Sequence, residues 1–100
     1  MEPLERAKVL FKAASIMRRD VYELSALQVL EVGKQWDQAY GDIGEAIDFL
    51  EYYGREMIRL GSPRRMGNAP GEMNQYFYQG KGVTAVIGPW NFPLAISAGM

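Results

Sequence analysis

The sequence predicts a mostly helical α+β chain, in which three helices over residues 3–60 precede one or two β-strands. Up to residue 60 the apolar residues recur at helical spacing. Aromatic and β-branched residues, which favour strands, gather instead between residues 73 and 87. Gly61-Ser62-Pro63 separates the two regions, because glycine and proline interrupt helices. One hundred residues are enough for one small domain with a marginal core.

The first two helices are predicted from their boundaries and their apolar faces. Pro3 suits the first turn of a helix, where its missing N–H costs nothing. Asp20, followed by Glu23, predicts a variant of the capping box that starts a second helix. Gly33 is placed to end this helix, because glycine readily adopts the left-handed conformation found just after helices. The apolar faces contain Ala7, Leu10, Phe11, Ala14 and Met17 in the first helix and Val21, Leu24, Leu27 and Leu30 in the second.

The third helix is the longest and is predicted from about Trp36 to Leu60. Glu45 projects almost opposite its apolar face, close to Phe49 and Tyr52. From the pattern alone, Glu45 is either a solvated surface residue or a partly buried carboxylate that faces a pocket. The apolar face contains Trp36, Tyr40, Ile43, Ile47, Leu50, Met57 and Ile58.

The second half of the chain carries the strand signals. Residues 61–72 are predicted to form a loop, residues 73–78 a strand, and residues 82–100 a second strand, a motif and the start of a helix. Gly80-Lys81-Gly82 makes a tight connection between residues 73–78 and the apolar run 83–87, so a hairpin is expected. The two glycines do not predict a nucleotide-binding loop, because they precede a strand instead of opening a helix.

The composition excludes several classes of protein. The chain has no cysteine and no histidine, so disulfides and thiolate metal sites are excluded and no metal site is expected. A net charge of −1 provides no field that would attract nucleic acid or an anionic membrane. The apolar runs are too short to span a membrane, and the first residues lack the pattern of a signal peptide. A cytoplasmic protein without a nucleic-acid or membrane partner is therefore expected.

Residues 87–94, Ile-Gly-Pro-Trp-Asn-Phe-Pro-Leu, form the most informative stretch of the chain. Two prolines restrict their own backbone and that of the residues before them, so Trp90 and Asn91 are held in one non-repetitive conformation. An uncharged amide at the mouth of a strand can donate a hydrogen bond to a developing oxyanion, as Asn and Gln side chains do in acyl chemistry. On local chemistry alone, a turn after an edge strand explains the same residues equally well.

This stretch resembles the first signature of the aldehyde dehydrogenase superfamily. Glu31-Val32-Gly33-Lys34 is similar to the E-x-G-K element that these enzymes carry one helix earlier. Residues 45–53, 70–76 and 91–96 resemble one branch of the family, the 1-pyrroline-5-carboxylate (L-glutamate γ-semialdehyde) dehydrogenases. The resemblance runs from about Leu4 to Met100, and it implies a fragment of the α/β aldehyde dehydrogenase fold.

The resemblance implies a role for the residues of the motif. Asn91 would donate to the oxyanion of a thiohemiacetal. The aldehyde substrate would meet Phe92, Ile96 and Glu45, the last as a pocket-lining or water-ordering carboxylate and not as the general base. The nicotinamide half of NAD would be bordered by Ile87, Gly88, Pro89 and Trp90. Residues 73–78 match the region that joins subunits in the family, so a homo-oligomer is expected.

The resemblance also draws attention to what the sequence lacks. The family's nucleophile is a cysteine and its general base is a glutamate in an E-L-G-G element, and neither occurs here. We therefore expect a fragment of an NAD-dependent enzyme that oxidises L-glutamate γ-semialdehyde to glutamate in proline catabolism. By itself the fragment would be inactive and without a complete NAD site. The alternative is a non-catalytic helical interaction or assembly module, because amphipathic helices are generic and an exposed strand edge favours self-association.

Overall fold

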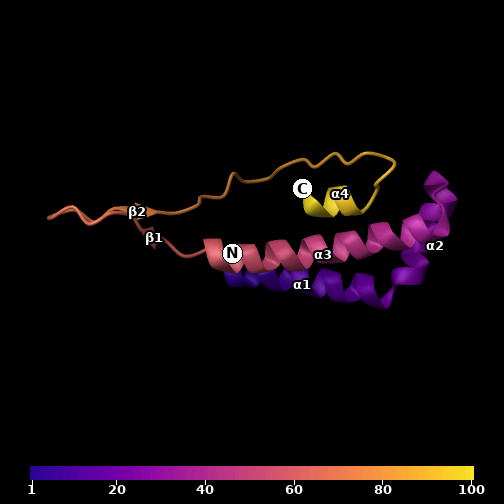
Figure 1. Cartoon of the computed structure of the whole chain (residues 1–100), viewed down its shortest axis with the longest axis horizontal. Helices are drawn as coiled ribbons and strands as arrows, with labels where there is room; N and C mark the ends of the chain where they lie inside the picture. The colour runs from indigo at the N-terminus through magenta and orange to yellow at the C-terminus, as the bar shows by residue number, and fades with distance from the viewer.

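The computed structural model describes residues 1–100 as an elongated molecule of 62 × 24 × 21 Å. Two long helices lie side by side, a third continues from one of their ends, and a narrow arm projects beyond the other end (Figure 1). The elements are α1 (Pro3–Arg19), α2 (Val21–Val32), α3 (Trp36–Leu60), β1 (Arg64–Arg65), β2 (Gln75–Tyr76) and α4 (Ala95–Gly99). The predicted mostly helical α+β fold class is confirmed.

The connection between α1 and α2 differs from the capping box that the sequence predicts. Asp20 separates the two helices but makes no side-chain hydrogen bond to a helix N–H. Its carboxylate instead accepts from the guanidinium of Arg19, over 2.6 Å at Oδ1 and 2.6 Å at Oδ2. The capping-box prediction is therefore wrong, because the neighbouring cation occupies both carboxylate oxygens. Gly33 does end α2 in the left-handed region, with φ 70°.

The core lies between α1 and α3, and small residues bring these helices close together. Its centre is Ala14, Ile43, Ile47 and Leu50, all buried. Gly54 is also buried, and a Cβ built there would lie 2.5 Å from Cε1 of Phe11, so the ring sits directly on the glycine. The full set of buried α3 residues is Ala39, Asp42, Ile43, Ala46, Ile47, Leu50 and Gly54.

Part of the predicted apolar faces is exposed. On α3 the aromatic residues Trp36 and Tyr40 face solvent, and on α2 so do Leu27 and Leu30. The buried residues of α2 are Ser25 and Gln28, which are polar. The predicted apolar faces therefore pack only in part: Ile43, Ile47 and Leu50 enter the core, whereas the four exposed residues do not.

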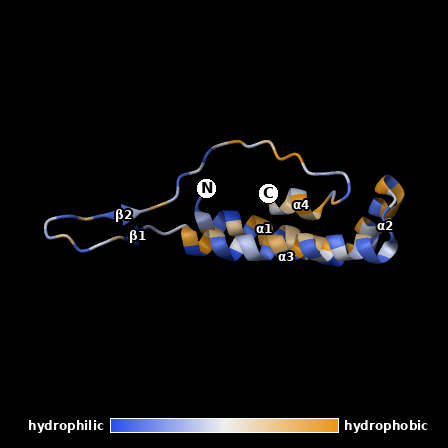
Figure 2. Ribbon diagram, turned by 45° about the horizontal axis from the view of Figure 1, so that its top comes forward, coloured by the Kyte–Doolittle hydropathy of each residue, from blue (hydrophilic) through white to orange (hydrophobic).

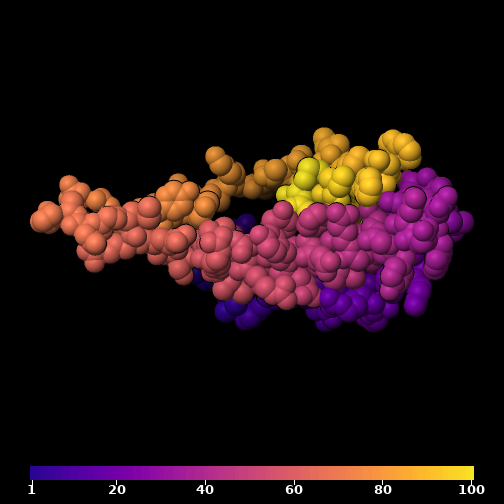
Figure 3. Space-filling view, in the orientation of Figure 1, coloured from indigo at the N-terminus to yellow at the C-terminus, as the bar shows by residue number.

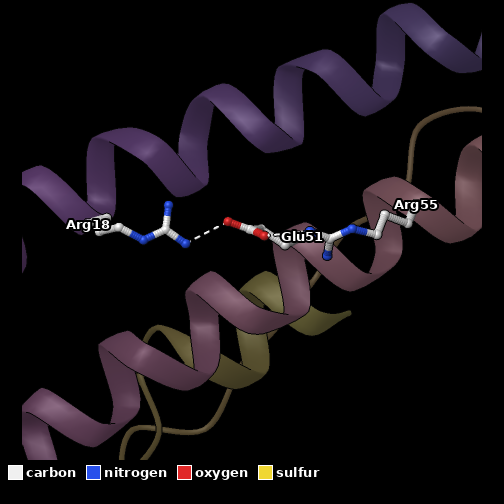
Figure 4. Close-up of polar contacts among 3 residues, drawn as sticks. All are labelled: Arg18, Glu51 and Arg55. Atoms are coloured by element: carbon white, nitrogen blue, oxygen red, sulfur yellow. Dashed lines mark hydrogen bonds and ion pairs between the residues drawn. The ribbon is translucent and has the colours of Figure 1, made fainter.

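An ion-pair cluster joins α1 to α3 on the molecular surface (Figure 4). One carboxylate oxygen of Glu51 accepts from Arg18 over 2.5 Å and the other accepts from Arg55 over 2.8 Å. The hydrogen bond from Arg18, followed by that from Arg55, holds the pKa of the Glu51 carboxyl below its usual range. The cluster therefore links the two helices from outside the core, where such exposed contacts contribute little to stability.

The strands pair differently from the prediction. β1 and β2 are antiparallel, with Arg64 opposite Tyr76, and they form the arm. The hairpin expected between residues 73–78 and 83–87 is wrong, and β1 lies in the stretch predicted as a loop. Residues 83–87 run back towards α4 outside any sheet, and the hydrophobic colouring of the ribbon before α4 in Figure 2 lies apart from the helices. A strand needs a neighbour to satisfy its backbone groups, and these residues have none within this chain.

The short helix α4 packs along α3 at the end of the chain. Ala95 is fully buried, and the partly buried Leu94 and Ala98 pack against the core. A Cβ on Gly99 would lie 3.0 Å from the ring of Phe49, so the far end of α4 reaches that residue. The space-filling view shows α4 lying against one side of α3 (Figure 3). No helix in the chain combines the length and the apolar character needed to cross a bilayer.

Candidate functional site

The motif at residues 87–94 lies against the connection between α2 and α3. Together they line an open groove of about 380 Å³. The two sequence elements that carry the family resemblance, separated by more than fifty residues, therefore form one site. The groove is lined by Val32, Gly33, Lys34, Gln35, Gln38, Trp90, Asn91 and Phe92.

Lys34 holds the motif in place from the α2–α3 connection. Its Nζ donates to the main-chain carbonyl of Asn91 over 2.9 Å. The same ammonium lies 4.3 Å from the centroid of the Phe92 ring, within the range of a cation–π interaction. Its side chain is only 10% exposed, so the lysine itself is largely shielded from water, although Asn91 and Phe92 are both exposed.

Asp42 lies behind Lys34 and is the most deeply buried charged side chain of the site. Its Oδ1 is 3.7 Å from Nζ of Lys34, and its own side chain is fully buried. Its Oδ2 accepts from Nε2 of Gln28 over 2.6 Å and, over a longer 3.4 Å, from the backbone N–H of Ala95. A charge out of water is tolerated only when it is paired and hydrogen-bonded. The carboxylate therefore joins α2, α3 and the start of α4 at one point.

Asn91 presents its side chain at the surface of the groove. The residue is exposed, and its side-chain amide makes no hydrogen bond within the chain, whereas its carbonyl is fixed by Lys34. The amide can therefore donate to a bound molecule while the main chain that carries it stays in place. Trp90 and Phe92 flank it, and both are exposed.

The remaining predicted residues lie around this groove without lining it. Ile87 and Pro89 are exposed on the approach to Trp90, and Ile96 is partly buried in α4. Gly88 has a packing role of its own, because a Cβ there would lie 2.1 Å from Oγ of Ser97 on α4.

Glu45 is exposed on α3, about one helical turn from both Asp42 and Phe49. Each of those residues contacts α4, Asp42 at Ala95 and Phe49 at Gly99. Glu45 therefore lies on the flank of α3 beside α4, outside the groove that contains Asn91. Its role at a substrate stays a prediction.

Asp42 and Gln28 were not predicted from the sequence. The signal was present, since Asp42 falls between Ala39, Ile43 and Ala46 on the buried side of an amphipathic helix. A carboxylate at a core position must have a partner, and Lys34 is the nearest cation before it in the sequence. Which residues complete the network depends on how α2 and α4 pack, and periodicity does not show this.

The fold and the site together define a segment of an aldehyde dehydrogenase. The model of the aldehyde dehydrogenase family matches residues 1–100, and the chain belongs to that family. Relatives include 1-pyrroline-5-carboxylate dehydrogenase 1 of Halalkalibacterium halodurans, 54% identical over 99% of this chain and 19% of the relative. 1-Pyrroline-5-carboxylate dehydrogenase 2 of Bacillus subtilis is 55% identical over 97% of this chain and 19% of its own length.

Solved structures agree with this assignment. Proline utilization A from Bdellovibrio bacteriovorus matches with a TM-score of 0.94 and 57% identity, over 99% of this chain and 10% of that one. A 1-pyrroline-5-carboxylate dehydrogenase from Thermus, solved with bound NAD, matches with a TM-score of 0.90 and 47% identity, over 99% of this chain and 19% of that one. The chain thus spans about a fifth or less of the proteins that it resembles.

Proposed function

We propose that this chain supplies the oxyanion-binding amide, Asn91, to an NAD-dependent dehydrogenase that oxidises L-glutamate γ-semialdehyde, the open form of 1-pyrroline-5-carboxylate, to glutamate. Relatives above 50% identity bear the name of that enzyme. The observation that carries the proposal is that the main chain of Asn91 is fixed while its side-chain amide is free to bind. Its carbonyl is held by the shielded Lys34, while its amide is exposed and unpaired within the chain.

The chemistry requires such a donor. When a thiol adds to the aldehyde carbon, the carbonyl oxygen gains negative charge, and a fixed N–H stabilises it more strongly than it stabilises the neutral aldehyde. Asn91 would donate through Nδ2 without a change in its own charge. Removal of one such donor costs on the order of 3 kcal/mol, or about 100-fold in rate. The thiol itself comes from outside these residues, because the sequence contains no cysteine.

We assign the nicotinamide half of NAD to the surface beside Asn91, because the residues there are apolar and exposed. Ile87 is 88% exposed and Trp90 is 75% exposed, and Pro89 holds the backbone between them. In this assignment Ile87, Gly88, Pro89 and Trp90 border the ring, which supplies the hydride acceptor when NAD is bound. Because Gly88 has no side chain, residues 87–90 can pack closely on Ser97, and this contact keeps them in place.

The substrate side would be formed by residues on the other flank of Asn91. Phe92 is 40% exposed and carries Lys34 against its ring. Ile96 follows one turn later on α4, and Glu45 lies on the neighbouring flank of α3 as a pocket-lining or water-ordering carboxylate. These three side chains would combine apolar contact for the carbon chain with one carboxylate that lines the pocket or orders water.

The arm is proposed to join subunits. Residues 73–78 include Tyr76, Phe77 and Tyr78, all exposed, and β2 belongs to a sheet of only two strands. Such a sheet leaves strand edges open to another chain. A homo-oligomer assembled through residues 73–78 would cover both the edges and the aromatic side chains.

The test is the activity of the complete polypeptide that contains these residues. NADH formation is followed with L-glutamate γ-semialdehyde, and Asn91→Ala is compared with the unmodified protein. We expect kcat to fall about 100-fold, with the Kd for NAD unchanged within about twofold. Asn68→Ala is the matched control, because Asn68 is exposed in the arm and makes no side-chain hydrogen bond. A loss of less than about tenfold in kcat, about 1.4 kcal/mol, would contradict the oxyanion role.

A further inference from the structure

One buried carboxylate is connected to both ends of the segment that carries Asn91. At the far end, Oδ2 of Asp42 accepts from the N–H of Ala95 over 3.4 Å. At the near end, Oδ1 lies 3.7 Å from Nζ of Lys34, which donates to the carbonyl of Asn91 over 2.9 Å. Residues 91–95 are therefore held at their first carbonyl and their last N–H by groups that converge on one side chain.

We infer that Asp42 is a positioning residue, which acts through Lys34 to fix the amide of Asn91 for catalysis. The inference rests on the proposed role of Asn91. Asp42 does not touch substrate or cofactor in this arrangement, since it is only 3% exposed beneath the groove. Its effect on the reaction is carried by the ammonium and by the start of α4.

The charge of Asp42 is what keeps Lys34 in place. A lysine side chain that is 10% exposed has given up most of its hydration, and a carboxylate beside it offsets that loss. Without the negative charge, the flexible lysine would regain water by turning outward. The carbonyl of Asn91 would then lose its donor, and the segment would be held only by its prolines and by α4.

Gln28 orients the carboxylate for this task. Its Nε2 donates to Oδ2 of Asp42 over 2.6 Å, which leaves Oδ1 facing Lys34. Three elements that are separate in the sequence, α2, α3 and α4, thus set the position of one exposed amide. Because an oxyanion donor works only at short range, a displacement of about 1 Å is enough to cost a large part of its effect.

A double-mutant cycle in the complete enzyme tests the inference. Asp42→Asn keeps the shape of the side chain and removes its charge. We expect kcat to fall about tenfold in the unmodified enzyme but less than about twofold in the Asn91→Ala background, since the amide to be positioned is then absent. The Kd for NAD should stay within about twofold in every variant. Glu51→Gln removes a carboxylate that pairs only with Arg18 and Arg55 and does not line the groove, so it is the control and should leave kcat unchanged.

A second pair of variants separates positioning from stability. Lys34→Met leaves the buried Asp42 without a counter-charge, so we expect a lower melting temperature and a lower kcat. Asp42→Asn combined with Lys34→Met leaves no unpaired charge and should recover the melting temperature, while kcat stays about tenfold low because the carbonyl of Asn91 still has no donor. This pair decides the matter if Asp42→Asn alone does not fold.

The outcomes distinguish the two proposals. An equal loss of kcat from Asp42→Asn with and without Asn91 would overturn the positioning role, as would recovery of kcat together with stability in the double variant. Either result leaves the proposed function intact, provided that Asn91→Ala alone is severely impaired. A nearly active Asn91→Ala enzyme would instead overturn the proposed function, and the positioning role with it.

Discussion

The contact between Phe11 and Gly54 predicts that replacing glycine by alanine changes the stability of the protein in opposite directions at two positions of α3, Gly54 and Gly41. A Cβ at Gly54 would lie 2.5 Å from Cε1 and 2.9 Å from Cζ of the Phe11 ring. At Gly41, in the same helix, a Cβ would meet nothing within 4 Å. Alanine is favoured over glycine in a helix interior by about 1 kcal/mol, and this gain applies at both positions.

The clash decides the sign at Gly54. Ordinary contact begins at 3.4 Å, so the ring must move by nearly 1 Å, together with the packing of α1 on α3. Overpacking of this kind costs about 1–3 kcal/mol, which outweighs the gain in helix propensity. We expect Gly54→Ala to destabilise the protein by about 1 kcal/mol and Gly41→Ala to stabilise it by about 0.5–1 kcal/mol.

Urea unfolding followed by circular dichroism measures both effects. The midpoint should move in opposite directions for the two variants, with similar slopes. Phe11→Leu in the Gly54→Ala background should recover part of the loss, because the ring is then absent. If both alanine variants were equally stabilising, Phe11 would not sit on Gly54, and the alignment of α1 with α3 described here would be wrong.

Two further predictions concern local features. Gly33 has φ 70°, so Gly33→Ala should destabilise the protein by about 1 kcal/mol, and Gly33→Asn should be tolerated better; urea midpoints check the order. Hydrogen bonds from Arg18 and Arg55 lower the pKa of Glu51, so its contribution to stability is present above the ordinary pKa of glutamate and is lost as pH falls through the lowered value. The urea midpoints of Glu51→Gln and the unmodified protein should therefore differ at neutral pH and converge in acid, and a gap that widened in acid would contradict the ion pair.

The parts of the fold that depend on local pattern were predictable. Helical periodicity located all three long helices, and the special backbone of Gly33 marked the end of α2. The strands were not, because residues 75–76 pair with residues 64–65 instead of the apolar run at 83–87. Strand pairing depends on which segments meet, and the β-propensity of one segment does not contain that information.

In the site, too, the residues of a local motif could be predicted, whereas the contacts that depend on tertiary packing could not. Asn91 and its prolines could be recognised from their chemistry and their resemblance to a family motif. Lys34 belonged to a second recognised element, yet its bond to the carbonyl of Asn91 follows only from the packing of the motif on the α2–α3 connection. Asp42 and Gln28 escaped notice because burial of a polar side chain is decided by all the elements around it.

The most direct test of the role of Asn91 is the ratio of kcat between the unmodified complete enzyme and its Asn91→Ala variant, with L-glutamate γ-semialdehyde and saturating NAD. If Asn91 is the oxyanion donor, the ratio is about 100 and the affinity for NAD is preserved. A ratio below about 10 would contradict it, because the exposed amide held above Lys34 and Asp42 would then not be the group that stabilises the oxyanion.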